Sequence, residues 1–219
     1  MAQLPYSFDP QPGYHSYKVT STLKDYLALL MASPEDQETI SRILKMIDDY
    51  VVQLKELRTK DLPETTRQVH GAIDGFFEKT PEEEKKEVRC RSGCTACCYI
   101  DVDVSGDEAA LIVEHCIANG IEIDKSYLVE QAAAGRSTYS PLSRCVFLKD
   151  NLCTIYSVRP IACRKHWVKT DPALCDFSSN ELNQVGSVFN VNAEILASAM
   201  LNVNEVMPFE QALLKQLEQ

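Results

Sequence analysis

The distribution of cysteine constrains this chain more than any other feature of its sequence. All nine cysteines lie between Cys90 and Cys175, and the residues before and after that stretch include none. Because nine is an odd number, the cysteines cannot all pair within one chain. We therefore look for the chemistry of this protein in the middle third of the chain.

The composition is that of an acidic globular protein. Hydrophobic residues make up 45% and charged residues 25%, which is ordinary for a folded domain. The net charge of −10 disfavours phosphate-rich partners, so we expect no nucleic acid. The N-terminus lacks a secretory signal, and the apolar run Leu27 to Ala32 is too short to span a bilayer. We expect a cytoplasmic protein with no membrane contact, whose cysteines bind metal or carry redox chemistry.

Helical periodicity dominates the sequence before the cysteines. A helix start at Ser33-Pro34-Glu35-Asp36 precedes apolar residues with the 3, 4, 3, 4 spacing of one helical face, which are Ile40, Ile43, Leu44, Ile47, Val51, Leu54 and Leu57. A shorter apolar pattern over Val69 to Phe77 and a capping box at Thr80-Pro81-Glu82-Glu83 predict two further helices.

Short strands are expected only around the cysteines. Apolar and acidic residues alternate from Ile100 to Val104, which predicts one half-buried strand. The residues Leu148-Lys149-Asp150-Asn151 predict the turn of a small hairpin. The capping box Ser105-Gly106-Asp107-Glu108 begins a helix that Asn119-Gly120 ends. Its apolar face comprises Ala109, Ile112, Val113, Cys116 and Ile117. Three more helices are expected near residues 124–134, 191–201 and 208–217.

These patterns predict a mainly α fold. Residues 1–20 are rich in Pro, Tyr and Gly and should form an irregular N-terminal arm. Residues 21–219 should form a single helical domain, with a small cysteine-rich metal-binding core at about residues 88–176. Because Leu142 to Cys163 has few large apolar residues, we expect metal ligation rather than burial to fix that segment.

The first cysteine cluster has the spacing of metal ligands. It reads Cys90-Arg-Ser-Gly-Cys94-Thr-Ala-Cys97-Cys98. Two residues between Cys94 and Cys97 let a tight turn direct both sulfurs at one ion, and Gly93 supplies the backbone freedom for that turn. Cys98 cannot easily point the same way as Cys97, so it is a candidate for a second metal or a redox partner.

The second cluster should approach the first in space. A hairpin would hold Cys145 and Cys153 at the base of facing strands, and the turn at Arg159-Pro160 would bring Cys163 back toward them. The predicted metal ligands are Cys90, Cys94, Cys97, Cys98, Cys145, Cys153 and Cys163. Of these, Cys94, Cys97, Cys153 and Cys163 should form the core of one centre with sulfurs within about 4 Å of one another.

Charged neighbours and the remaining candidates complete the sequence-based prediction of the site. Four arginines directly adjoin cysteines, which lowers the pKa of a thiol and offsets thiolate charge: Arg89, Arg91, Arg144 and Arg164. Cys116 lies on the apolar face of its own helix and should fill the core. Cys175 and His166 are left open, Cys175 as a metal ligand and His166 as a ligand or proton carrier.

At these residues the chain resembles the YkgJ-type cysteine-cluster proteins, a family described as chelating zinc or iron. Cys94-x-x-Cys97-Cys98 resembles the end of the C-x-x-C-x-x-C-C signature. The second half of the family pattern is resembled by Cys145-x-Phe-Leu together with Cys153-x-Ile-Tyr-x-x-Arg159-Pro160-x-x-Cys163-Arg164. Three residues separate Cys90 from Cys94, where the signature has two. The resemblance implies a metal site at about residues 88–176 and implies no particular reaction.

Several functions are compatible with the sequence. Six or seven candidate sulfurs exceed the four ligands of one zinc ion, which favours a binuclear centre, an iron–sulfur cluster such as 4Fe-4S, or spare thiols. The leading hypothesis is a zinc- or iron-binding protein whose helices form a scaffold and a surface for a protein partner. The alternatives are an iron–sulfur-dependent protein-modification enzyme or its accessory subunit, radical S-adenosylmethionine chemistry, and a thiol redox sensor or metal chaperone.

Overall fold

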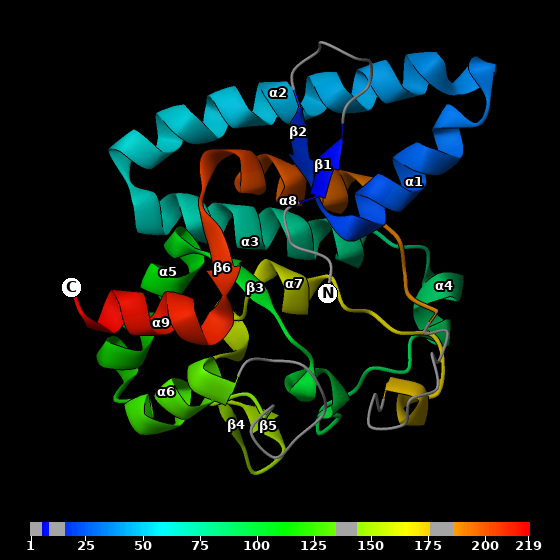
Figure 1. The fold of residues 1–219 in the computed structure, drawn as a ribbon. Coiled ribbons are helices and arrows are strands. Elements are labelled where there is room, and N and C mark those ends of the chain that lie inside the picture. The colour runs from blue at the N-terminus through cyan, green and yellow to red at the C-terminus, as the bar shows by residue number, and fades with distance from the viewer. Residues whose placement is uncertain (1–5, 9–15, 135–143, 176–185) are drawn as a thin grey trace.

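The computed structural model describes residues 6–8, 16–134, 144–175 and 186–219 of the chain, and its fold is mainly α, as predicted (Figure 1). The helices are α1 (Ser21–Met31), α2 (Gln37–Lys60), α3 (Leu62–Glu78), α4 (Glu82–Glu87), α5 (Gly106–Asn119), α6 (Lys125–Ala134), α7 (Ile161–Arg164), α8 (Val191–Val203) and α9 (Phe209–Leu217). Short 3₁₀ turns comprise η1 (Pro34–Asp36), η2 (Ala96–Tyr99), η4 (Tyr156–Val158) and η5 (Pro172–Cys175).

The described strands form three antiparallel pairs. β1 (Tyr6–Phe8) pairs with β2 (Tyr17–Val19), β3 (Asp103–Ser105) with β6 (Val206–Pro208), and β4 (Leu148–Lys149) with β5 (Leu152–Cys153). Each pair is a separate two-stranded sheet. The fold is therefore built mainly from helices, and the β3–β6 pair joins segments that are distant in the sequence.

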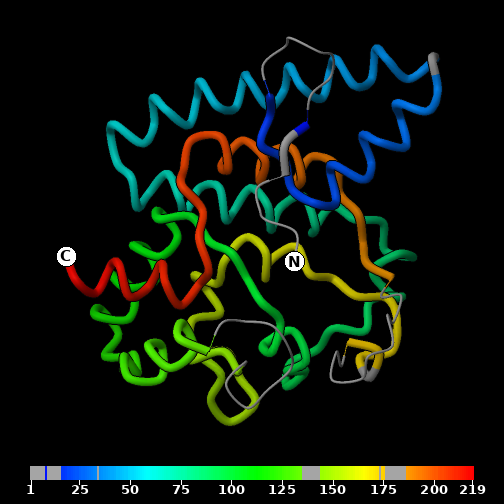
Figure 2. The backbone as a smooth tube through the Cα atoms, in the orientation of Figure 1, coloured from blue at the N-terminus to red at the C-terminus, as the bar shows by residue number. Residues whose placement is uncertain are grey.

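One hydrophobic core lies among α1, α2, α3 and α8. Figures 1 and 2 show α2, α8 and α3 as neighbouring layers. Every residue of α8 from Ala193 to Met200 is buried, because this helix is covered on all sides. Ile47 of α2 and Ile73 of α3 are fully buried in the same core.

A second core lies among α5, α6, α9 and the β4–β5 hairpin. Its centre includes Ile112 and Leu213, together with the rings of Phe147 and Phe209, whose centroids lie 5.9 Å apart. The ion pair between Arg58 Nε of α2 and Asp107 Oδ2 of α5, at 2.6 Å, connects the helices of the two cores. The second cysteine-bearing segment contributes Phe147, Ile155 and Val158 to the second core and Ile161 to the first, whereas residues 90–100 contribute no buried residue to either core.

The long helix is confirmed, although its start differs from the prediction. Ser33 precedes the η1 turn without a capping hydrogen bond from its side chain, and the α-helix proper begins at Gln37. Leu57 lies at the edge of the apolar face and remains 37% exposed. The sequence analysis did not anticipate α1, in which only Leu23 and Leu27 are buried.

The two predicted capping boxes have opposite outcomes. Ser105 and Glu108 form the predicted box at the start of α5, and Gly120 ends that helix with φ of 62°. Thr80 does not cap α4, because Pro81 occupies the N-cap position and no side chain supplies a capping bond. Ile117, predicted on the buried face of α5, is 77% exposed.

The structure also corrects the predictions for the N-terminal arm and the first strand. Within the predicted irregular arm, residues 6–8 and 17–19 are paired strands, and Phe8 and Val19 are buried. The rest of that arm up to residue 15 lies outside the described residues. The predicted strand at 100–104 is β3 at 103–105, because its antiparallel partner β6 ends at Pro208, which faces Asp103.

The predicted hairpin is present, but it is shorter. Asp150 and Asn151 have φ of 50° and 61°, which permits a two-residue turn. In this register Leu148 faces Cys153. Cys145 therefore lies before the ladder and not at the base of a facing strand, which corrects the predicted placement. The first residues of the Leu142–Cys163 segment lie outside the described part of the chain.

Candidate metal centre

Two backbone hydrogen bonds bring the cysteine-bearing segments together. The Cys145 N–H donates to the carbonyl of Cys98 at 2.7 Å, which joins the first cluster to the hairpin. The Arg89 N–H donates to the carbonyl of Val168 at 2.7 Å, which joins the start of the first cluster to the chain after α7. The first cluster is thereby held beside the hairpin and beside the chain that follows α7.

Cys97 is the common neighbour of the clustered thiols. It is hydrogen-bonded to Cys98, and its charge acts on Cys153 of β5 and on Cys163 of α7. Cys98 in turn interacts with the charges of Cys145 and Cys153. Sulfurs from η2, the hairpin and α7 therefore share one electrostatic neighbourhood.

The adjacent thiols of Cys97 and Cys98 titrate as a pair. The hydrogen bond that Cys98 donates lowers the pKa of Cys97 to about 7, and the charge of Arg159 acts in the same direction. The same hydrogen bond, followed by burial, raises the pKa of Cys98. Cys98 therefore keeps its proton at neutral pH, while Cys97 is partly converted to a thiolate.

Arg159 supplies the positive charge that the sequence analysis assigned to other arginines. Its charge lowers the pKa of Cys97 and opposes the rise that burial causes in the pKa of Cys153. Arg164, which directly follows Cys163, turns instead into the scaffold, where it is 3% exposed and pairs with Asp74 of α3. Adjacency in sequence therefore does not predict which arginine lies close to a thiol, because successive helical side chains point in different directions.

Three carboxylates from three helices anchor the short α7 turn that carries Cys163. Glu108 of α5 accepts the Ile161 N–H at 2.7 Å, and Asp74 of α3 pairs with Arg164. Glu194 of α8 binds the ammonium of Lys165 at 2.5 Å. No signal in the sequence pointed to these contacts, since the partners lie 29 to 90 residues apart.

Glu108 is the most enclosed of these anchors. Besides Ile161 it accepts hydrogen bonds from the backbone and hydroxyl of Ser105, and its Oε1 lies 3.5 Å from His70 Nε2. Burial alone would raise the pKa of this carboxyl, but the contacts from His70, Ile161 and Ser105 hold it below its usual value. Cys163 therefore stands on a turn whose position is fixed by charged hydrogen bonds.

Cys90 lies beside the segment that follows α7. Its sulfur accepts the Val168 N–H at 3.3 Å and donates to the His166 carbonyl at 3.6 Å. His166 is partly buried, and burial lowers its pKa, so its imidazole is neutral at pH 7. Its Nε2 has no hydrogen-bond partner within the described part of the chain.

Cys116 packs in the second core, as predicted. It is 1% exposed among apolar side chains, and burial raises the pKa of its thiol to about 11. This cysteine serves packing, and the remaining eight are the candidates for chemistry.

The thiols lie in one region of the fold, but they do not surround a common metal position. Within the described ranges, no three His, Cys, Asp or Glu side chains converge closely enough to hold a metal ion. The 4 Å convergence predicted for Cys94, Cys97, Cys153 and Cys163 is thus not seen, and the ligand assignment stays a prediction. The donor chemistry nevertheless fits a thiophilic metal: soft sulfurs, a nearby guanidinium, and a loop at 90–100 in which no residue is buried.

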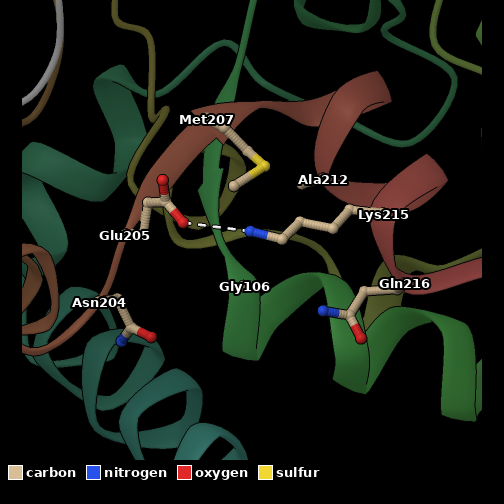
Figure 3. Close-up of a pocket in the computed structure, with 7 residues that line it drawn as sticks. All are labelled: Gly106, Asn204, Glu205, Met207, Ala212, Lys215 and Gln216. Atoms are coloured by element: carbon tan, nitrogen blue, oxygen red, sulfur yellow. Dashed lines mark hydrogen bonds and ion pairs between the residues drawn. The ribbon is translucent and has the colours of Figure 1, made fainter. Parts of the chain in front are cut away.

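A small pocket lies apart from the cysteines, between the start of α5 and the segment from Asn204 through α9 (Figure 3). Its volume is about 180 Å³, below the roughly 300 Å³ at which small-molecule sites usually begin. The ion pair between Glu205 Oε2 and Lys215 Nζ, at 3.2 Å, occupies part of it. The cysteine cluster is therefore the stronger candidate for the functional site.

Comparison with known proteins supports this choice. Residues 89–184 match the family described as "CxxCxxCC: Putative zinc- or iron-chelating domain". The match confirms the resemblance seen in the cysteine spacing. Its range includes all nine cysteines, from Cys90 to Cys175. No curated protein and no solved structure matches the chain. In the described part of the chain, no helix has the length and apolar character needed to cross a membrane.

Proposed function

We propose that this protein binds zinc or iron through the thiolates of its cysteine cluster, with Cys97 at the centre of the ligand set. The observation that carries this proposal is the shared neighbourhood of Cys97, Cys153 and Cys163, which come from three separate segments. A bound zinc ion would supply structural cross-linking or Lewis acidity, and bound iron would add electron transfer.

The surrounding residues have separate tasks in this proposal. Arg159 offsets the negative charge that accumulates when several thiols ionise. Asp74, Glu108 and Glu194 hold the Cys163 turn against the helical scaffold. The turn that carries Cys163 is therefore fixed to the scaffold, whereas Cys97 lies in the segment 90–100, in which no residue is buried.

The location and partners of the protein form the less specific part of the proposal. The charge of −10 supports a protein that avoids nucleic acid, and the reduced thiols that the cluster requires support a cytoplasmic location. The helical flanks outside residues 89–184 would serve as scaffold and as the surface for a protein partner.

Anaerobic purification followed by metal and sulfide analysis tests the proposal. We expect zinc or iron to copurify with the chain, and we expect Cys97→Ser to lower the metal content. Cys116→Ser is the matched control, since Cys116 lies in the second core and should leave metal content unchanged. A metal-free protein that also fails to take up Zn²⁺ or Fe²⁺ after reduction would refute the proposal.

A further inference from the structure

Arg164 is a buried cation in the segment that carries Cys163. It is the last residue of the Arg159-Pro160-x-x-Cys163-Arg164 motif, and it is 3% exposed. Within the described part of the chain, no other arginine or lysine is buried. Burying a charge is costly unless the charge is fully paired, so the contacts of this side chain indicate what it does.

The guanidinium of Arg164 binds three acceptors at once. Its Nε donates to the carbonyl of Arg159 at 2.9 Å, and its Nη2 donates to the carbonyl of Ser157. Its Nη1 donates to Oδ2 of Asp74 on α3. Each nitrogen of the planar fork therefore has an acceptor, and none of these acceptors is a thiol. Arg164 thus acts on the backbone and on the scaffold.

Two of those acceptors belong to the loop that separates Cys153 from Cys163. This loop of nine residues includes the η4 turn and the start of α7. The Arg164 N–H also donates to the carbonyl of Pro160, at 3.0 Å. Arg164 therefore binds three carbonyls of the loop, at residues 157, 159 and 160, and closes the loop onto the turn that carries Cys163.

Asp74 connects Arg164 with the second arginine of the motif. Its Oδ1 lies 3.8 Å from Nη2 of Arg159, while its Oδ2 pairs with Arg164. The Arg159 side chain is also held by Tyr156, whose carbonyl accepts from Nη1 at 3.0 Å and whose ring centroid lies 3.8 Å from the guanidinium carbon. One carboxylate of α3 therefore contacts both arginines, and Arg164 holds the backbone of Arg159 as well.

We propose that Arg164 is a positioning residue of the metal site: its guanidinium fixes the loop between Cys153 and Cys163, and with it Arg159, before any metal binds. This inference rests on the proposed function and adds a residue that acts through other residues. A loop that is ordered on folding loses no further conformational entropy on metal binding. Arg164 should therefore raise the affinity for metal without contacting the ion.

Lysine is the informative substitution at this position. Arg164→Lys keeps the positive charge, but a single ammonium cannot reproduce the fork that reaches two carbonyls and a carboxylate. Arg67→Lys is the matched control, because Arg67 also lies on the scaffold and forms a half-exposed pair with Glu114. Ile47→Val is a second control, because it removes a methyl group from the first core and lowers stability at a residue of α2.

The test measures metal affinity and local order in the reduced full-length protein under anaerobic conditions. Competition with a chromophoric chelator gives the affinity for Zn²⁺, and we expect Arg164→Lys to bind at least about tenfold more weakly than the wild type. Both controls should stay within about twofold of the wild type. Amide hydrogen exchange of the metal-free protein should rise at residues 155–165 in Arg164→Lys and not in Arg67→Lys.

Two results would overturn the inference while leaving the proposed metal binding intact. If Arg164→Lys exchanges faster at residues 155–165 but binds Zn²⁺ as the wild type does, Arg164 serves the fold alone. If exchange there is unchanged, the loop does not depend on Arg164. A wild type that binds neither Zn²⁺ nor Fe²⁺ would instead refute the proposed function itself.

Asp74→Asn keeps the test decisive if circular dichroism shows Arg164→Lys to be unfolded without metal. The Asp74 side chain is 37% exposed, and asparagine retains an acceptor oxygen for Arg164 while it removes the charge. Because hydrogen bonds between charged groups are the stronger ones, we expect Zn²⁺ affinity to fall by about threefold in this variant. Wild-type affinity in a folded Asp74→Asn protein would count against the inference.

Discussion

The two cysteine-bearing segments are built in opposite ways. Residues 90–100 include no buried residue and no α-helix or strand, only turns. Residues 147–164 include seven buried residues, which are Phe147, Leu148, Ile155, Val158, Pro160, Ile161 and Arg164. The second segment is therefore held by packing and charged hydrogen bonds, while the first has little besides its sulfurs to hold it.

This difference corrects one prediction from the sequence. We expected ligation rather than burial to fix Leu142 to Cys163, because that segment has few large apolar residues. Most of those few are nevertheless buried, with Phe147 and Ile155 each 1% exposed, although Leu152 is 53% exposed. The number of apolar residues is thus less informative than their placement against another core, here that of α5, α6 and α9.

The largest expected effect comes from removing the anchor of the Cys163 turn. Glu108→Ala would leave the Ile161 N–H and the Ser105 N–H without their buried acceptor. We expect the free energy of unfolding to fall by about 3–5 kcal/mol, as measured by chemical denaturation of the metal-free protein. Glu114→Ala, on the same helix but in a half-exposed pair with Arg67, should cost less than about 1 kcal/mol. Equal losses would show that α7 is not held in this way.

The same carboxylate should make stability depend on pH. The pKa of Glu108 is lower in the folded protein, so its charged form contributes stability that is present above the unfolded value of about 4.3. That contribution is lost as the pH falls through the folded pKa. Glu108→Gln keeps an acceptor oxygen without the titration, and its unfolding free energy should therefore decline less steeply below about pH 4.5 than that of the wild type.

A buried thiol offers a test that separates packing from ligation. Cys116→Ser places a hydroxyl in the second core, where we expect a loss of about 1–3 kcal/mol in unfolding free energy with no loss of metal. Cys90→Ser should reverse this pattern, because Cys90 is exposed and its sulfur belongs to the cluster. Thermal unfolding and metal analysis of the two variants together provide the comparison. Metal loss in Cys116→Ser would show that its assignment to the core is wrong.

Metal removal should affect the two segments unequally. After chelation, we expect amide hydrogen exchange to rise about tenfold or more at residues 90–100, a change of roughly 1.4 kcal/mol in local opening free energy. Residues 147–164 should change little, since their burial and the carboxylate anchors do not require metal. Exchange followed by peptide mass spectrometry resolves the two ranges. A uniform rise across both would mean that the metal stabilises the whole region.

Local patterns were sufficient to predict much of the fold. Apolar spacing predicted α2 and α3, and the Ser105–Glu108 box predicted the first residue of α5. Pairings between distant segments were not predictable, because β3 gains its partner only about a hundred residues later. Ile117 was misplaced because the width of a buried helical face depends on the neighbouring elements, which a single helix pattern does not reveal.

The segment that carries the candidate site was predicted from the sequence, but the surroundings of that site were not. Cysteine spacing and the family resemblance identified the segment that the family match confirms. The anchors Asp74 and Glu194 lie on flanking helices, and nothing in the sequence connects them with Cys163. Cys175 was left open because its 11-residue separation from Cys163 has no characteristic ligand spacing, and only the fold places it against the first cluster.

The smallest expected effect concerns the arginines. The sequence favours those that adjoin cysteines, such as Arg91, whereas the structure places the charge of Arg159 against Cys97. Because the hydrogen bond from Cys98 is the larger cause of the lowered pKa, Arg159→Gln should raise the pKa of Cys97 from about 7 by less than about one unit. Arg91 is exposed, and Arg91→Gln should change that pKa even less.

The measurement is the pH dependence of alkylation of Cys97 in the reduced, metal-free protein, with the modified peptide quantified by mass spectrometry. At pH 7 the Arg159→Gln variant should react several-fold more slowly, because a smaller fraction of Cys97 is thiolate. Cys98→Ala should slow the reaction further, since it removes the hydrogen bond that stabilises this thiolate. A larger shift for Arg91→Gln than for Arg159→Gln would show that sequence adjacency, and not the fold, determines which cation acts on the cluster.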